Sequence, residues 1–166
     1  LIVNSDRACL FQFHNGSIFT TKRPIWKVSN THETVSPGTS SEIKNLQDIK
    51  ASSIIEFLQL FWTHEYPSGV IKISPLYCID CPNANKEHDK KVIFIEVDKL
   101  EDGYYKSLLI EEGIKCAINV PIYNNDNNCM GFVAVNYCEN NDMEKIKKFS
   151  SEVCKYTSKI QFILLN

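Results

Sequence analysis

Glycine is scarce in this chain, with six glycines among 166 residues, and they form no phosphate-binding or dinucleotide-binding pattern. The sequence also lacks G-x-S-x-G and H-E-x-x-H, the signatures of α/β-hydrolase nucleophiles and of zinc peptidases. These absences argue against the enzymes that short motifs define. The sequence therefore predicts a non-catalytic protein and offers no catalytic residue.

Long apolar runs and a strong charge of one sign are missing as well. No run reaches the roughly 18 residues that cross a bilayer, and the first residues lack the charged and apolar regions of a signal peptide. The net charge of −2 argues against a dominant nucleic-acid or membrane surface, since phosphates require clustered Lys and Arg. We therefore expect a cytoplasmic protein that binds neither nucleic acid nor membrane.

Cysteine is abundant, but the seven cysteines are odd in number and scattered, which does not suit a closed disulfide framework. We expect mostly reduced, structural thiols. The pair Cys78 and Cys81 has a spacing that could hold zinc, with His88 and either Cys138 or His64 as further ligands. A redox pair and an incidental loop pair remain open alternatives. Zinc at this pair is the one cofactor that the sequence suggests.

The first half of the chain alternates apolar and polar residues in two places. Residues 7–13 and 24–35 are predicted to pair as an antiparallel hairpin, with a turn at His14-Asn15-Gly16. A long helix is predicted from Ser40 or Ser41 to near Trp62, because its apolar residues keep helical spacing. A short strand at 70–73, a loop at 77–91 and a strand or loop at 91–97 follow.

The second half gives clearer patterns. Residues 104–112 are predicted to form a helix that Gly113 stops. Alternation at 116–122 and 129–137, around an Asn-rich turn, predicts a β-hairpin. A last helix is predicted to start at Asn141 or Asp142. Its final turns, 160–165, are apolar nearly all round, which suggests either a homodimer through this C-terminal helix or a helix end that covers an edge of the core.

The order G-I-K-C-A-I-N-V-P-I (113–122), polar turn, C-M-G-F-V-A-V-N-Y (129–137) and acidic helix resembles the C-terminal half of a GAF domain, a small PAS-related sensory fold. The resemblance covers residues 104–166, and the first half only in the order of its elements. It implies one α/β (α+β) domain over residues 1–166, with a central antiparallel sheet of about five or six strands and helices packed on it. Since GAF-like folds open with a helix that is not visible here, we expect a fragment of a longer protein.

The predicted N-terminal hairpin carries a polar cluster beside aromatic residues. We predict a ligand site in which aromatic rings stack, Lys27 meets an anionic group and polar side chains donate and accept hydrogen bonds. Its residues are Phe13, His14, Asn15, Trp26, Lys27, Ser29 and Glu33. Such a set suits a nucleotide-like or aromatic anion. Asn15-Gly16 as a plain turn pair is the alternative.

Three functions follow from the resemblance and these residues. The first is a non-catalytic sensory or regulatory domain that binds a small ligand between the sheet and its covering loops. The second is a protein-interaction or dimerisation module with a vestigial pocket. The third is a small thiol-based reductase on a GAF scaffold, whose nucleophile would be Cys78, Cys81, Cys116 or Cys138. The bilin-attaching cysteine of phytochrome-like relatives has no identifiable counterpart.

Overall fold

The computed structural model describes residues 4–18, 24–61, 70–73, 92–126, 128–139, 146 and 148–166. The strands in these ranges form one antiparallel sheet in the order β3-β2-β1-β7-β6-β5-β4. The elements are β1 (Arg7–Ile18), β2 (Pro24–Val35), β3 (Ile49–Lys50), the 3-10 helix η1 (Ala51–Ile54), α1 (Ile55–Gln59), β4 (Val70–Ile73), β5 (Val92–Glu96), the 3-10 helix η2 (Val97–Lys99), α2 (Tyr104–Glu111), β6 (Cys116–Tyr123), β7 (Cys129–Tyr137) and α4 (Ser150–Leu165).

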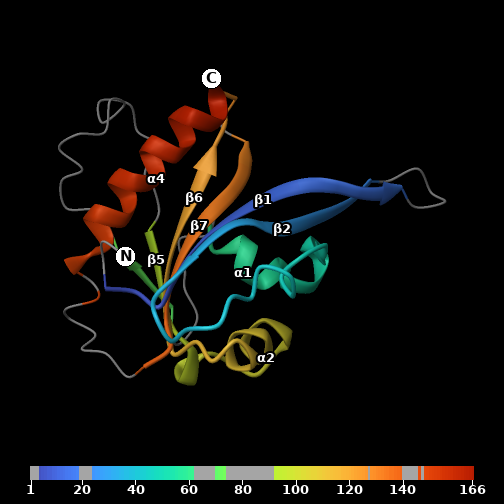
Figure 1. Ribbon diagram of the computed structural model, residues 1–166. Coiled ribbons are helices and arrows are strands. Elements are labelled where there is room, and N and C mark those ends of the chain that lie inside the picture. The colour runs from blue at the N-terminus through green and yellow to red at the C-terminus, as the bar shows by residue number, and fades with distance from the viewer. Residues whose placement is uncertain are drawn as a thin grey trace.

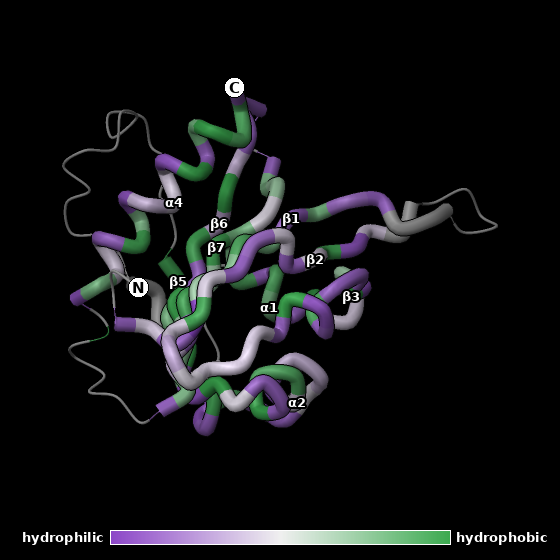
Figure 2. The backbone as a smooth tube through the Cα atoms, viewed as in Figure 1, coloured by the Kyte–Doolittle hydropathy of each residue, from purple (hydrophilic) through white to green (hydrophobic). Residues whose placement is uncertain are grey.

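This architecture confirms the predicted class, a central antiparallel sheet with packed helices. The described sheet has seven strands, against the five or six expected, and one of them is the two-residue β3. Helix α4 covers one face of the sheet, and α1 and α2 cover the other (Figure 1). Strands β5, β6 and β7 are buried on both faces and are apolar along most of their length (Figure 2).

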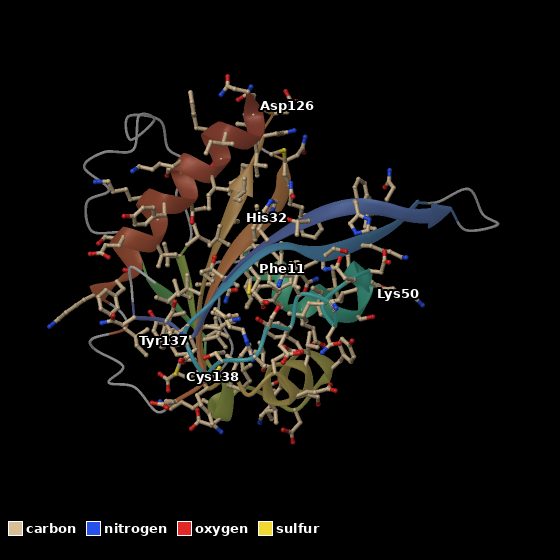
Figure 3. The ribbon with its side chains drawn as sticks, in the orientation of Figure 1. Phe11, His32, Lys50, Asp126, Tyr137 and Cys138 are labelled. Atoms are coloured by element: carbon tan, nitrogen blue, oxygen red, sulfur yellow. The ribbon has the colours of Figure 1, made fainter. Side chains whose placement is uncertain are left out.

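The two faces of the sheet hold separate cores. Alternation along β7 sends Phe132 and Ala134 toward α1 and α2, and Val133 and Val135 toward α4. Helix α4 buries Val153, Cys154 and Thr157 on its side. Phe11 of β1, labelled in Figure 3, belongs to the core on the side of α1 and α2. Its ring stacks on that of Phe132, with centroids 4.7 Å apart. A side chain's position in its strand therefore decides which core it joins.

The N-terminal hairpin is longer than predicted. Strand β2 matches its predicted bounds, but β1 continues through His14, Asn15 and Gly16 to Ile18, so the predicted turn at these residues is wrong. Asn15 instead pairs with Trp26 across the hairpin, next to a register shift that absorbs one residue. The far ends of β1 and β2 project beyond the rest of the sheet (Figure 1).

The predicted long helix from residue 40 to 62 is also wrong. Residues 36–48 are irregular and are followed by β3, η1 and the short α1. The Glu33 carboxylate accepts hydrogen bonds from the Ser41 hydroxyl and from the backbone N–H groups of Glu42 and Ile43, which fixes a non-helical backbone. Asp48, at a φ of 57°, then turns the chain into β3. The apolar residues of the pattern are buried nonetheless, among them Leu46, Ile54, Phe57, Leu58 and Phe61.

The other described elements agree with the predictions. The strand at 70–73, the strand within 91–97, the helix that ends before Gly113 and the hairpin of β6 and β7 are all confirmed. Gly113 has a φ of 71°, the left-handed conformation that commonly ends a helix. The predicted loop at 77–91 and the predicted helix start at Asn141 or Asp142 lie outside the described residues. No helix in the described ranges is long and apolar enough to span a bilayer.

Candidate functional site

A cavity of about 50 Å³ lies between the sheet and the layer formed by α1 and α2. Its floor comes from β1, β2, β6 and β7, and its roof comes from η1, α1 and α2. The lining is mostly apolar, with three polar exceptions. The lining residues are Phe11, Val28, Leu46, Ile49, Ile54, Phe57, Tyr105, Leu108, Leu109, Glu112, Ile114, Asn119, Phe132, Ala134 and Asn136.

Three aromatic rings hold the roof against the floor. Phe57 of α1 stacks on Tyr105 of α2, with centroids 4.4 Å apart, and meets Phe132 of β7 edge-on at 5.2 Å. Such pairs add about 0.5–1.5 kcal/mol each beyond the area that they bury. Burial raises the pKa of Tyr105 far above its ordinary value, so its phenol stays neutral. The cavity therefore has aromatic walls that are fixed in place.

The polar side chains of the cavity are unusual because some of their atoms lack hydrogen-bond partners. Asn119 and Asn136 lie on the cavity face of β6 and β7 and are 2% and 5% exposed. Among the described residues, neither Nδ2 of Asn119 nor Oε2 of Glu112 has a hydrogen-bond partner. Each such atom costs about 1–3 kcal/mol of stability, unless a ligand or water pairs with it.

A buried arginine lies beside these groups. Arg7 pairs with Asn136 in the register of β1 and β7, and it is 4% exposed. Its Nη1 donates to the backbone oxygen of Glu112 at 2.7 Å, and its Nε donates to that of Ser40 at 3.0 Å. The carboxylates of Glu112 and Glu42 lie 3.9 and 3.7 Å from the guanidinium. One guanidinium thus ties β1, the irregular segment and the end of α2 together.

Glu112 has the most perturbed carboxyl group at the cavity. Burial raises its pKa to about 7. The nearby carboxylates of Glu42, Glu111 and Glu33 act in the same direction, whereas the positive charge of Arg7 opposes them. Glu112 therefore exchanges its proton near neutral pH, inside a cavity where its charge is poorly solvated.

The predicted ligand residues lie in several places. Three of them form a polar cluster with Asp48 on one face of β2, the face opposite to the one on which Val28 lies. His14 Nε2 lies 2.8 Å from Ser29 Oγ, and Ser29 Oγ accepts a hydrogen bond from the backbone N–H of Asp48 at 2.9 Å. Lys27 Nζ donates to Asp48 Oδ1 at 3.1 Å. The structure thus brings His14, Lys27 and Ser29 together with Asp48, a residue that the sequence did not suggest.

The other four predicted residues lie elsewhere. Phe13 packs against the core on the α1 and α2 side, while Asn15 is exposed and the ring of Trp26 is 53% exposed. The Glu33 carboxylate accepts hydrogen bonds from the Ser41 hydroxyl and from the backbone N–H groups of Glu42 and Ile43. The seven residues do not form one pocket, and their role in binding stays a prediction.

The structure tests the cysteine predictions only for the cysteines that it describes. Cys78, Cys81, His64 and His88 lie outside the described residues, so zinc at this pair remains untested. No three metal-binding side chains gather within the ranges that the structure describes, and the five cysteines there form no disulfide. Burial raises the pKa of Cys9 to about 12 and of Cys129 to about 11. Burial also raises the pKa values of Cys116 and Cys138, which makes these two candidate nucleophiles weaker.

Sequence reasoning missed Arg7, Glu112, Asn119 and Asn136. A signal was present for the two asparagines, because each interrupts an apolar strand: Asn119 between Ile118 and Val120, and Asn136 between Val135 and Tyr137. Polar residues are rarely buried without a partner, so a polar residue in a doubly buried strand indicates a site. Arg7 and Glu112 gave no such signal, since both lie at the ends of their elements.

Comparison with known proteins supports the architecture. No protein-family model and no curated protein sequence matches the chain. Its structure is similar to the phycoerythrobilin-bound GAF domain of a cyanobacterial phytochrome, with a TM-score of 0.58 and 14% identity over 97% of this chain and 77% of that one. It is also similar to a phycocyanobilin-bound GAF domain of a cyanobacterial phytochrome (TM-score 0.52, 16% identity, 96% and 76% covered). A third is the chromophore-binding domain of Stigmatella aurantiaca phytochrome P1 (TM-score 0.52, 15% identity), of which the chain spans 48%. Identities this low establish the fold alone.

Proposed function

From the GAF-like fold that this chain has, we propose that it is a non-catalytic sensory or regulatory domain that binds a small molecule in the cavity between the sheet and helices α1 and α2. The observation that supports this function is the pair of buried polar atoms without hydrogen-bond partners, on Asn119 and Glu112, which both line the cavity. A void left by imperfect packing is apolar, whereas this cavity offers a few converging polar groups within apolar walls, as ligand sites do.

A bilin does not fit this cavity. Drug-sized ligands occupy roughly 300–1,000 Å³, and the cavity measures about 50 Å³. Burial also holds Cys9, on the same side of the sheet, as a protonated thiol with a pKa of about 12. A nucleotide is likewise too large. An aromatic anion would have to bind at His14, Lys27 and Ser29 on the other face, which stays a separate prediction.

The contacts around the cavity suggest how a bound ligand would affect the rest of the domain. A ligand that pairs with Glu112 acts at the C-terminal end of α2, where Arg7 also bonds. Arg7 in turn bonds Ser40 and lies 3.7 Å from Glu42 in the irregular segment. Occupancy of the cavity therefore changes how firmly β1, this segment and α2 are held together.

Replacing Asn119 with leucine tests the site. We expect this variant to lose a small molecule that the wild-type protein retains. Without ligand, its free energy of unfolding should be about 1–2 kcal/mol higher than that of the wild type, because the substitution removes a buried amide N–H group that has no hydrogen-bond partner. Native mass spectrometry of protein purified from cells, compared with the denatured mass, measures retention. Urea unfolding of ligand-free protein measures stability.

Asn125→Leu is the matched control, because Asn125 is exposed in the turn between β6 and β7. It should retain the ligand and change stability little. If Asn119→Leu destabilised the protein and left the retained mass unchanged, Asn119 would be a structural residue and the cavity would not be the site.

A second candidate function is homodimerisation through α4. The last turns of this helix leave apolar side chains in solvent, with Phe162 68% and Ile163 72% exposed. Leu164 and Tyr156 are also exposed. A second copy of the chain presents the same apolar surface, so a symmetric pairing would bury both.

Replacing both Phe162 and Ile163 with serine should convert such a dimer to a monomer and leave the fold intact. Sedimentation equilibrium measures the mass, and circular dichroism checks the fold. Lys159→Ser, at an exposed position of the same helix, serves as the control and should keep the dimer. A wild-type protein that stays monomeric at high concentration would exclude this function.

A further inference from the structure

The charges around the cavity do not cancel. Two buried or half-buried carboxylates, Glu112 and Glu42, share the guanidinium of Arg7. Arg7 donates to the backbone oxygens of Ser40 and Glu112 and to the hydroxyl of Ser40, so each of its three nitrogens already donates a hydrogen bond. When Glu112 is ionised, an anionic ligand would meet a surplus of negative charge at this edge, whereas a cation would balance it.

Two unpartnered atoms define what a ligand must supply. Glu112 Oε2 accepts no hydrogen bond, on a residue that is 8% exposed, and Arg7 Nη1 lies 3.9 Å from it, beyond hydrogen-bond distance. Asn119 Nδ2 is a donor without an acceptor, on a residue that is 2% exposed. Both residues line the same cavity. A matching molecule offers a positively charged donor to the first atom and an oxygen acceptor to the second.

The rest of the lining agrees with a small cation. The rings of Phe57, Tyr105 and Phe132 border the cavity, and aromatic walls are compatible with an organic cation. A volume of about 50 Å³ admits a molecule of only a few non-hydrogen atoms.

We propose that the ligand of this cavity is a small primary amine that carries an oxygen acceptor, of the size of ethanolamine. Its ammonium group pairs with Glu112, and its oxygen accepts from Asn119. This inference rests on the proposed function, because it requires that the cavity be a binding site.

The ionisation of Glu112 makes this binding depend on pH. Burial raises its pKa to about 7, and the charged groups that face it are Arg7 of β1, Glu33 of β2, Glu42 of the irregular segment and Glu111 of α2. An ammonium ion binds the ionised form, so the apparent Kd should fall about tenfold between pH 6 and pH 8. The amine itself stays charged over this range.

Three small molecules test the ammonium group and the oxygen acceptor of the ligand separately. Ethanolamine carries both groups, ethylene glycol replaces the ammonium with a neutral hydroxyl, and propylamine lacks the oxygen. Each is titrated into the wild-type chain at constant ionic strength, and nuclear magnetic resonance follows the side-chain amide of Asn119. We expect a Kd for ethanolamine at least tenfold lower than for either analogue. Glu112→Gln should remove its advantage over ethylene glycol, and Glu101→Gln, at an exposed carboxylate that is not among the groups acting on Glu112, should preserve it.

Different binding results would contradict the amine ligand and the cavity as a binding site. If ethylene glycol binds as tightly as ethanolamine, or Glu112→Gln keeps the preference for the amine, the cation inference is wrong and the cavity remains a site. Absence of ethanolamine binding also overturns this inference. If, in addition, the wild type retains no molecule that Asn119→Leu loses, the proposed function fails as well.

Discussion

Replacing Gly131 with alanine should lower the free energy of unfolding by more than about 3 kcal/mol. Gly131 lies in β7, between Gln12 of β1 and Ile122 of β6 in the sheet register. A Cβ atom at this position would lie 2.0 Å from the backbone oxygen of Phe11. Because this neighbour is backbone, relief requires β1 and β7 to separate, in the strands that form the cavity floor. Urea unfolding followed by circular dichroism measures the loss.

Gly103→Ala provides the control for this prediction. Gly103 precedes α2 with extended backbone at φ 179°, and the nearest atom to an added Cβ would be Glu56 Oε2 at 3.8 Å. The expected cost is about 1 kcal/mol or less, from the poorer helix cap. Equal losses for the two variants would show that the close approach of β1 and β7 does not constrain the fold.

Stability should fall as the pH rises from about 4.5 to about 7, and Glu112 should be the cause. Below its ordinary pKa of 4.5 this carboxyl is protonated in both the folded and the unfolded chain. Between 4.5 and about 7 the folded state keeps a proton that the unfolded state releases, so rising pH favours unfolding. Above pH 7 both states are ionised and the difference stays constant. The full loss is about 3 kcal/mol.

Glu112→Gln should remove this part of the pH dependence, since the amide is neutral at every pH and similar in shape. At pH 8 the variant should be more stable than the wild type by up to about 3 kcal/mol, and at pH 4.5 the two should be nearly equal. Urea unfolding at several pH values measures this difference. Glu101→Gln, at an exposed carboxylate that does not act on the pKa of Glu112, should keep the wild-type slope. A Glu112→Gln variant with an unchanged slope would show that Glu112 is ionised normally.

The parts of the fold that were predicted correctly are those in which local pattern and burial agree. Strands β6 and β7 alternate or stay apolar around a polar turn, and Gly113 ends α2 in a left-handed conformation that favours glycine. Strand β2 was located to the residue. In each case the feature depends on residues close in sequence.

The errors arose where distant residues override local preference. Apolar spacing in residues 40–62 is compatible with a helix, but the carboxylate of Glu33 binds the backbone of this segment and holds it irregular. Asn15 and Gly16 prefer a turn, yet pairing with β2 keeps them in a strand. Neither contact is visible in a short window of sequence.

The sequence by itself determined the class of the fold, the hairpin at its centre and the absence of common catalytic motifs, because these depend on periodicity and composition. Only the tertiary structure decided the site. The cavity forms where β1, β6, β7 and α2 meet and is lined by Glu112, Asn119 and Asn136, with Arg7 beside them, 129 residues before Asn136 in the chain. The unpaired atoms and the raised pKa of Glu112 come from burial, which chain folding creates and residue identity alone does not reveal.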